Sequence, residues 1–110
     1  MGFERGDIHW VAFPQCLPHG AEIDKSRPCI ILSMARVSTW RKTVVVVPLS
    51  HGSSDAPPLI VDMPSAGAGS KAFCDQIAAI DKLRIGKKIG VLAAADLRFL
   101  EECVRQVLGL

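Results

Sequence analysis

The sequence predicts an α+β fold in which a small, strongly bent antiparallel sheet or partly open barrel is capped by one C-terminal helix. Short apolar segments alternate with breaks rich in proline, glycine and small polar residues, a pattern typical of antiparallel strands. One segment contains four consecutive valines, at positions 44–47, which favour a buried strand over a helix. From Ala94 onward the apolar residues recur instead at the spacing of an amphipathic helix.

Length and composition indicate one globular domain spanning residues 1–110. With 110 residues, 49% of them hydrophobic, the chain can bury a real core and is not of the disordered class. Its longest apolar runs have the length of strands, so we expect a soluble protein with no membrane partner. The first residues contain no secretory signal, which makes the cytoplasm the expected compartment.

The cysteine spacing argues against a zinc site or a disulfide framework, and the net charge does not indicate any particular class of partner. The four cysteines, at positions 16, 29, 74 and 103, form no Cys-x-x-Cys pair. We therefore expect reduced, buried thiols, because a zinc site or a disulfide framework needs closer and patterned spacing. The net charge of +2 is too small to identify a nucleic-acid binder. Local basic clusters matter more, and they comprise Lys25 with Arg27, Arg36 with Arg41 and Lys42, and Lys82, Arg84, Lys87 and Lys88.

The N-terminal third predicts a strand followed by a long loop. The alternating segment from Ile8 to Phe13 predicts the strand. Pro14, Pro18 and Gly20 then predict a surface loop over residues 14–26.

The middle of the chain predicts two buried strands joined by a short connection. Cys29 to Leu32 predicts one strand, and residues 33–42 a connection with one helical turn. Thr43 to Leu49 predicts the other strand, which we expect to end at Pro48 and Ser50. The weaker elements expected after it are a loop at 51–58, a short strand at 59–62, a small-residue loop at 64–70, a basic connection at 81–86 and a last strand at 88–92.

The C-terminal part predicts one more strand and the helix. Residues 72–80 predict a strand with Asp75 and Gln76 in its middle, where polar groups need a partner or a purpose. The helix that follows should place Glu101 within reach of Arg105, four residues on.

Arg27 is the first candidate for chemistry. Pro28 favours an extended conformation at Arg27, which places the guanidinium at the mouth of a strand. Its planar fork of donors matches phosphate oxygens and stays charged at any working pH. An ion pair with Glu22 or Asp24 is the structural alternative.

Three polar sites fall at strand boundaries or interruptions and can converge in one cleft of a small barrel. They are the segment from Glu22 to Arg27, Ser50, and Asp75 with Gln76. An Arg, a hydroxyl and a carboxylate around a cleft suit phosphodiester cleavage in RNA, whose 2′-hydroxyl is an internal nucleophile. Such a reaction requires no metal and no cofactor. Taken alone, Ser50 is most often a strand-terminating hydroxyl, and Asp75 fits a structural role as well as a catalytic one.

Five segments, in order and over nearly the whole chain, resemble the MazF/PemK toxin family. They are Arg5-Gly-Asp-Ile-His-Trp10, Gly20-x-Glu22 followed by Arg27-Pro28, Val45-Val-Val-Pro-Leu-Ser50, Cys74-Asp-Gln-Ile77 with Ile80-Asp-Lys82, and Gly86-Lys-Lys-Ile-Gly90. The resemblance implies an SH3-like barrel that forms a homodimer and cleaves single-stranded RNA at short sequences. It also implies a cognate antitoxin of a type II system, whose disordered tail occupies the RNA groove.

The same resemblance implies roles for particular residues. Arg27 would be the main catalytic cation, Ser50 would hold the scissile phosphate, and Asp75 would act as the base. Cleavage would leave a cyclic phosphate and a free 5′-hydroxyl. The residues expected to contact RNA, from the resemblance and from their places around the cleft, are Glu22, Lys25, Gln76, His19 and His51.

The chain also departs from the family pattern. Ala21 and Ile23 replace a Ser and a Gln of the loop, Ala78 stands where an Arg commonly follows, and Phe73 replaces an Arg of the PemK branch. A catalytically weakened barrel that acts as a binding or regulatory module with its antitoxin is therefore one alternative. A gyrase-poisoning toxin of the same fold is another, although the C-terminal end offers no aromatic anchor.

Overall fold

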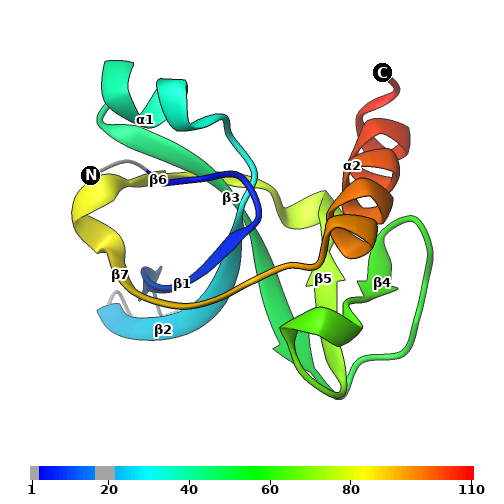
Figure 1. The fold of residues 1–110 in the computed structure, drawn as a ribbon. Coiled ribbons are helices and arrows are strands. Elements are labelled where there is room, and N and C mark those ends of the chain that lie inside the picture. Colours follow the sequence, from blue (N-terminus) through cyan, green and yellow to red (C-terminus); the bar gives the residue numbers. More distant parts are fainter. Residues whose placement is uncertain (1–2, 17–21) are drawn as a thin grey trace.

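The chain folds into a bent sheet of seven antiparallel strands with a long C-terminal helix (Figure 1). The computed structural model describes residues 3–16 and 22–110, and it describes side chains in these ranges except at 14–16 and 22–25. The strands are β1 (Asp7–Cys16), β2 (Glu22–Ile31), β3 (Thr43–His51), β4 (Ile60–Asp62), β5 (Ser70–Phe73), β6 (Ala78–Asp81) and β7 (Ile85–Val91). The helices are α1 (Ala35–Trp40) and α2 (Ala94–Leu108), and three short 3-10 turns are η1 (Pro64–Ala66), η2 (Cys74–Gln76) and η3 (Lys82–Arg84).

The strand order is β4-β5-β3-β2-β1-β7, and β6 joins β3 beside this path. The sheet is bent and not closed, because among the described strands β4 and β7 remain at its two ends. β3 is the central strand: it pairs with β2 on one edge, and with β6 and then β5 on the other. The predicted α+β class with a strongly bent antiparallel sheet and a C-terminal helix is confirmed.

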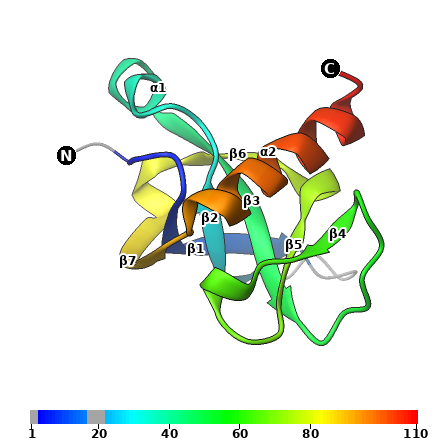
Figure 2. The same cartoon turned by 45° about the vertical axis from the view of Figure 1, so that its right-hand side comes forward.

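Buried side chains lie on both faces of the sheet, in two separate groups. The helix-side core contains Ile8, Ile30, Val47, Leu49, Val61, Met63, Ala72, Cys74, Leu92, Leu100, Cys103 and Val104. The small core on the other face contains Val11, Cys29, Ile31, Val44, Val46 and Ile80. Alternation along β3 sorts its residues, with Val47 and Leu49 toward α2 and Val44 and Val46 away from it. Figure 2 shows α2 lying across the first of these faces.

The predicted loop over residues 14–26 is wrong in its extent, because most of this segment is strand. β1 continues to Cys16 and β2 begins at Glu22, and the two pair from Ile8 opposite Ile30 to Cys16 opposite Glu22. Pro14 is tolerated because β7 pairs with β1 only as far as Val11, so β1 has one neighbouring strand beyond that point.

The predicted strand over residues 72–80 is also wrong, because it is two strands. β5 ends at Phe73, η2 follows, and β6 begins at Ala78. Asp75 and Gln76 therefore lie exposed on a turn and not inside a sheet ladder, which removes the need for buried partners. β3 likewise extends past Pro48 to His51, and β7 begins three residues before the expected Lys88.

The C-terminal helix agrees with the prediction, apart from one ion pair. Glu101 accepts a hydrogen bond from the guanidinium of Arg5 at 2.9 Å, and not from the expected Arg105. Within the part of the chain that the structure describes, no helix is both long enough and apolar enough to cross a membrane.

The cysteines whose side chains are described are buried and free, as predicted. Burial raises the pKa of the Cys29 and Cys74 thiols to about 12, and it also raises the pKa of Cys103. In the unfolded chain such thiols lose their protons at about pH 8.5 to 9. The folded state keeps these thiols protonated. The part of the folding stability that comes from this protonation is therefore fully present below that range, and it is lost as the pH rises toward 12.

We therefore expect the free energy of unfolding to fall above about pH 9, by up to ~1.4 kcal/mol per pH unit for each thiol. Urea unfolding in a reducing buffer at several alkaline pH values measures this fall. The chain contains no tyrosine, so no phenol contributes to it. A Cys29→Ala variant should show a shallower fall, and an identical pH profile in this variant would contradict the expectation.

Candidate functional site

The candidate site lies where β2 and β3 separate beyond the small core. Their pairing ends with Cys29 opposite Pro48. Two residues further along each strand, on the same face, stand Arg27 and Ser50, and continuing the register places them across from each other. Both side chains are half-buried. The cation and the hydroxyl that the sequence identified separately therefore lie on one face of two neighbouring strands, just beyond the end of their pairing.

The charge of Arg27 acts on the small core. Arg27 lies opposite Val11 of β1, and its carbonyl oxygen accepts a weak hydrogen bond from the Cys29 thiol at 3.8 Å. Burial raises the pKa of this thiol to about 12, and the nearby Arg27 charge opposes the rise. Cys29 therefore stays a neutral thiol and is not a candidate nucleophile.

The predicted alternative for Arg27 was an ion pair with Glu22 or Asp24. These two side chains lie outside the described residues, although their backbone is part of β2. The site role of Arg27 and the ion-pair role both remain predictions.

Asp75 and Gln76 lie at the other edge of β3, nearer the middle of that strand than Ser50. η2 lies between β5, which pairs with Leu49 to His51, and β6, which pairs with Thr43 to Val46. η2 also contacts β3 itself. Arg27 and Asp75 therefore flank β3 from opposite sides, with Ser50 on the strand between them.

Sequence reasoning missed Lys71, which is the cross-strand partner of Ser50. Its ammonium group lies 2.7 Å from Asp55 Oδ1 and 3.4 Å from Asp62 Oδ1. Its hydrogen bond with Asp55 is the largest cause of a raised pKa, so Lys71 remains charged. The only signal in the sequence was a single lysine between the small-residue loop at 64–70 and the strand predicted at 72–80. Which residue of the next strand lies beside it depends on the register of the sheet.

Of the remaining predicted contacts, His51 is the one whose side chain lies within the described residues, and it is not gathered here. His51 follows Ser50 and points to the opposite face of β3, where its Nε2 lies 3.3 Å from Ser70 Oγ. His19 lies outside the described residues, as do the side chains of Glu22 and Lys25. The register does place the backbone of Lys25 opposite Phe13 and that of Glu22 opposite Cys16.

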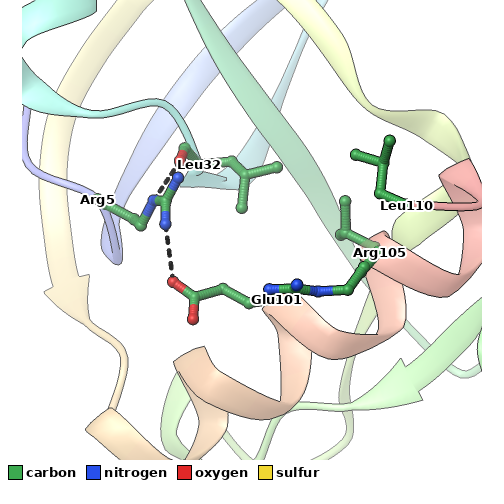
Figure 3. A pocket seen from close by; sticks show the side chains of 6 residues that line it. Arg5, Leu32, Glu101, Arg105 and Leu110 are labelled. Carbon is green, nitrogen blue, oxygen red and sulfur yellow. Dashed lines mark hydrogen bonds and ion pairs between the residues drawn. The ribbon is translucent and has the colours of Figure 1, made fainter.

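A hollow of about 320 Å³ lies elsewhere, between the N-terminal turn and α2 (Figure 3). Arg5 crosses its mouth and donates to the Leu32 carbonyl at 2.7 Å as well as to Glu101. The other residues lining it are Val104, Arg105 and Leu110. Among the side chains that the structure describes, none of the predicted site residues lines this hollow.

The face carrying Arg27, Ser50 and Lys71 can bind an anion and stabilise charge on it. The Arg guanidinium and the Lys ammonium supply positive charge, and the Ser hydroxyl supplies a neutral donor. The carboxylate of Asp75, exposed on η2 at the other edge of β3, is a group that can accept a proton. These are the groups that phosphodiester cleavage by an internal hydroxyl requires.

Comparisons with known proteins give both a family and a fold. A family model described as a PemK-like, MazF-like toxin of type II toxin-antitoxin system matches residues 4–108. An endoribonuclease from mycobacterial species has 22% sequence identity and a TM-score of 0.80, over 100% of this chain and 94% of that chain. A MazE-MazF structure (Form-III) from Deinococcus radiodurans has 18% identity and a TM-score of 0.81, over 100% and 99%.

A third similar structure is a mycobacterial endoribonuclease in complex with its cognate antitoxin. Its identity is 20% and its TM-score 0.76, over 98% of this chain and 96% of that chain. At such identities these three similarities establish the shared fold.

Proposed function

Because the chain belongs to the PemK-like, MazF-like toxin family of type II toxin–antitoxin systems, we propose that it is a sequence-selective endoribonuclease that cleaves single-stranded RNA without a metal. The observation that carries this proposal is the placement of Arg27 and Ser50 on one face of neighbouring strands. Asp75 on η2, at the other edge of β3, completes the set of groups.

The reaction uses the 2′-hydroxyl of the RNA as its nucleophile. Asp75 accepts the proton of this hydroxyl, the 2′-oxygen bonds to phosphorus, and the bond from phosphorus to the 5′-oxygen breaks. Arg27 stabilises the charge of the five-coordinate phosphorus, while Ser50 donates a hydrogen bond to a phosphate oxygen. The leaving oxygen takes a proton from solvent, because Arg27 keeps its charge. The products are a 2′,3′-cyclic phosphate and a 5′-hydroxyl end.

The rest of the RNA strand extends beyond these three residues. We propose that Gln76, next to Asp75 on the exposed η2 turn, contacts a base or the backbone of the RNA. Glu22, Lys25, His19 and His51 remain proposed RNA contacts. His51 would then act from the rim, since its ring lies on the face opposite to Ser50.

The proposed partners are a cognate antitoxin and a second copy of the chain. Membership of a toxin–antitoxin family supports an antitoxin as partner, and a complex with a cognate antitoxin has been solved for a protein of the same fold. We propose that a disordered tail of the antitoxin occupies the RNA groove and blocks cleavage. The cytoplasm, where mRNA is available, is the proposed compartment, and growth arrest is the proposed result.

Cleavage of a long, unstructured RNA by the purified protein in EDTA tests this function. We expect discrete cuts with 5′-hydroxyl and cyclic-phosphate ends, and end mapping then gives the sequence preference. An inactive Arg27→Ala protein, prepared identically, excludes a contaminating nuclease. If the folded, antitoxin-free protein cuts none of a varied set of RNAs, the enzyme is excluded and a binding or regulatory module takes its place.

A further inference from the structure

Four strands carry a row of polar side chains on the face that bears the site. Asp62 of β4 pairs with Lys71 of β5, and Lys71 pairs with Ser50 of β3. Arg27 of β2 lies on the same face as Cys29, two residues beyond the last pair between β2 and β3. Directly paired residues point to the same face, so all four project from the side of the sheet opposite to the helix-side core. Figure 1 shows β3, β5 and β4 side by side.

Lys71 is held in place, unlike most surface lysines. Its side chain is only 17% exposed, and two carboxylates fix its ammonium group, Asp55 at 2.7 Å and Asp62 at 3.4 Å. Both carboxylates are about half exposed, so the ion pairs lie at the surface and not inside the core. Isolated surface ion pairs contribute little to stability. Two carboxylates around one ammonium group fix its position instead. A positive charge held in a fixed position can bind an anionic ligand without first having to be ordered.

The order of the residues in this row indicates which kind of ligand it can bind. Asp62 stands on the far side of Lys71 from Ser50, and Ser50 stands between Lys71 and Arg27. Paired strands lie ~4.8 Å apart, so Lys71 begins close to Ser50, while Arg27 lies on the other side of β3, beyond the end of its pairing with β2. Two cations on either side of a hydroxyl fit a chain of phosphates better than a single anion.

We propose that Lys71 is a second cation of the RNA site, that it contacts a backbone phosphate next to the one held by Ser50, and that Asp55 and Asp62 are its positioning residues. This inference rests on the proposed function, because it takes RNA as the ligand. Lys71 binds the strand without touching the reacting atoms. Its loss should therefore raise KM and leave kcat nearly unchanged.

Binding to an RNA that cannot be cut tests Lys71 separately from the chemistry. A single-stranded, random-sequence oligoribonucleotide with 2′-O-methyl groups throughout serves as the probe, because phosphate contacts are independent of sequence. Lys71→Met should weaken binding about tenfold and reduce the slope of log affinity against log salt by roughly 0.7, the value of one phosphate contact on a single strand. Lys71→Arg should retain most of the affinity.

Lys87→Met is the matched control, because it removes the same charge from an exposed position on β7. If its effect on binding equals that of Lys71→Met, only net charge matters and the proposal is overturned. Circular dichroism and thermal unfolding establish that each variant is folded.

Substituting the two aspartates distinguishes a positioning role from a simple charge effect, because the two predict opposite changes in RNA affinity. Asp62→Asn and Asp55→Asn each remove a negative charge near the strand, so simple electrostatics predicts tighter binding of RNA. If the carboxylates position Lys71, both variants should bind the probe more weakly despite the lost charge. Tighter binding in both would exclude the positioning role.

The same samples separate this inference from the proposed function. Wild-type protein that binds the probe in a Lys71-dependent way but cuts no RNA would overturn the nuclease and keep Lys71 as a phosphate contact. Protein that cuts RNA equally well with Met at position 71 at every substrate concentration would overturn the role of Lys71 and keep the nuclease. Wild-type protein that neither binds nor cuts would overturn both.

Discussion

Replacing Arg27 by Lys is expected to reduce RNA cleavage by roughly 10²- to 10³-fold in kcat, the usual cost of removing one donor that stabilises transition-state charge. Lys keeps the charge but presents a single ammonium in place of a planar fork, so it cannot make two parallel hydrogen bonds to a phosphate. Single-turnover cleavage in EDTA measures the loss. The fold should survive, because a Lys stem can cover the apolar surface beside Val11 much as Arg does.

Arg41→Lys is the matched control for this change, since Arg41 is exposed between α1 and the start of β3, whereas Ser50 lies near the other end of that strand. It should cut RNA at the wild-type rate. Arrest of growth on expression gives a second measurement, and it distinguishes a nuclease from a gyrase poison. A nuclease loses its toxicity with Arg27→Lys, whereas a gyrase poison keeps it and also inhibits supercoiling in vitro. Wild-type cleavage by Arg27→Lys would remove Arg27 from the chemistry.

The parts of the fold that the sequence predicted are those with a strong local signal. The valines of β3 and the periodic apolar residues of α2 each indicate a buried face from the local sequence alone, so both elements lie where they were expected. The extension of β1 past Pro14 could not be predicted in this way. Whether a strand tolerates proline depends on whether a neighbouring strand needs its N–H, and that neighbour, β7, comes some 70 residues later.

Asp75 and Gln76 show the same limit at the site. In the sequence they looked like polar residues inside one strand, and the apolar residues on both sides supported that interpretation. The structure resolves the conflict by breaking the strand at η2, because β3 pairs with β5 and β6 in two different registers. Asp75 and Gln76 lie where the register of pairing with β3 changes. The alternation of polar and apolar residues along one segment does not reveal such a change.

Arg27 and Ser50 could be identified from the sequence because each lies close to a proline, Pro28 in one case and Pro48 in the other. The strand boundaries expected there were wrong, because β2 begins at Glu22 and β3 continues to His51. Lys71 could not, since its relevance comes entirely from its pairing with Ser50 and Asp62. His51 illustrates the reverse case. A loop was predicted there, but the strand continues and its alternation turns the ring to the other face.

Leu100→Ala is expected to destabilise the protein by about 3 kcal/mol, because it removes a fully buried side chain and leaves a cavity. Leu100 is 0% exposed and joins α2 to the helix-side core, in which Cys74 belongs to η2. For a domain of this size such a loss lowers Tm by roughly 10 °C or more. Urea unfolding at neutral pH measures the free energy directly.

Phe99→Ala is the control, since Phe99 precedes Leu100 on the same helix but is 47% exposed. It should cost less than about 1 kcal/mol, within the range of surface substitutions. At a temperature where Leu100→Ala remains folded, its cleavage rate per folded molecule should match the wild type. Arg27 and Ser50 project from the face opposite to α2, so the cavity lies on the far side of the sheet from them. A large loss of activity in fully folded Leu100→Ala would instead show that packing of η2 against α2 positions Asp75, and that the two faces are coupled through β3.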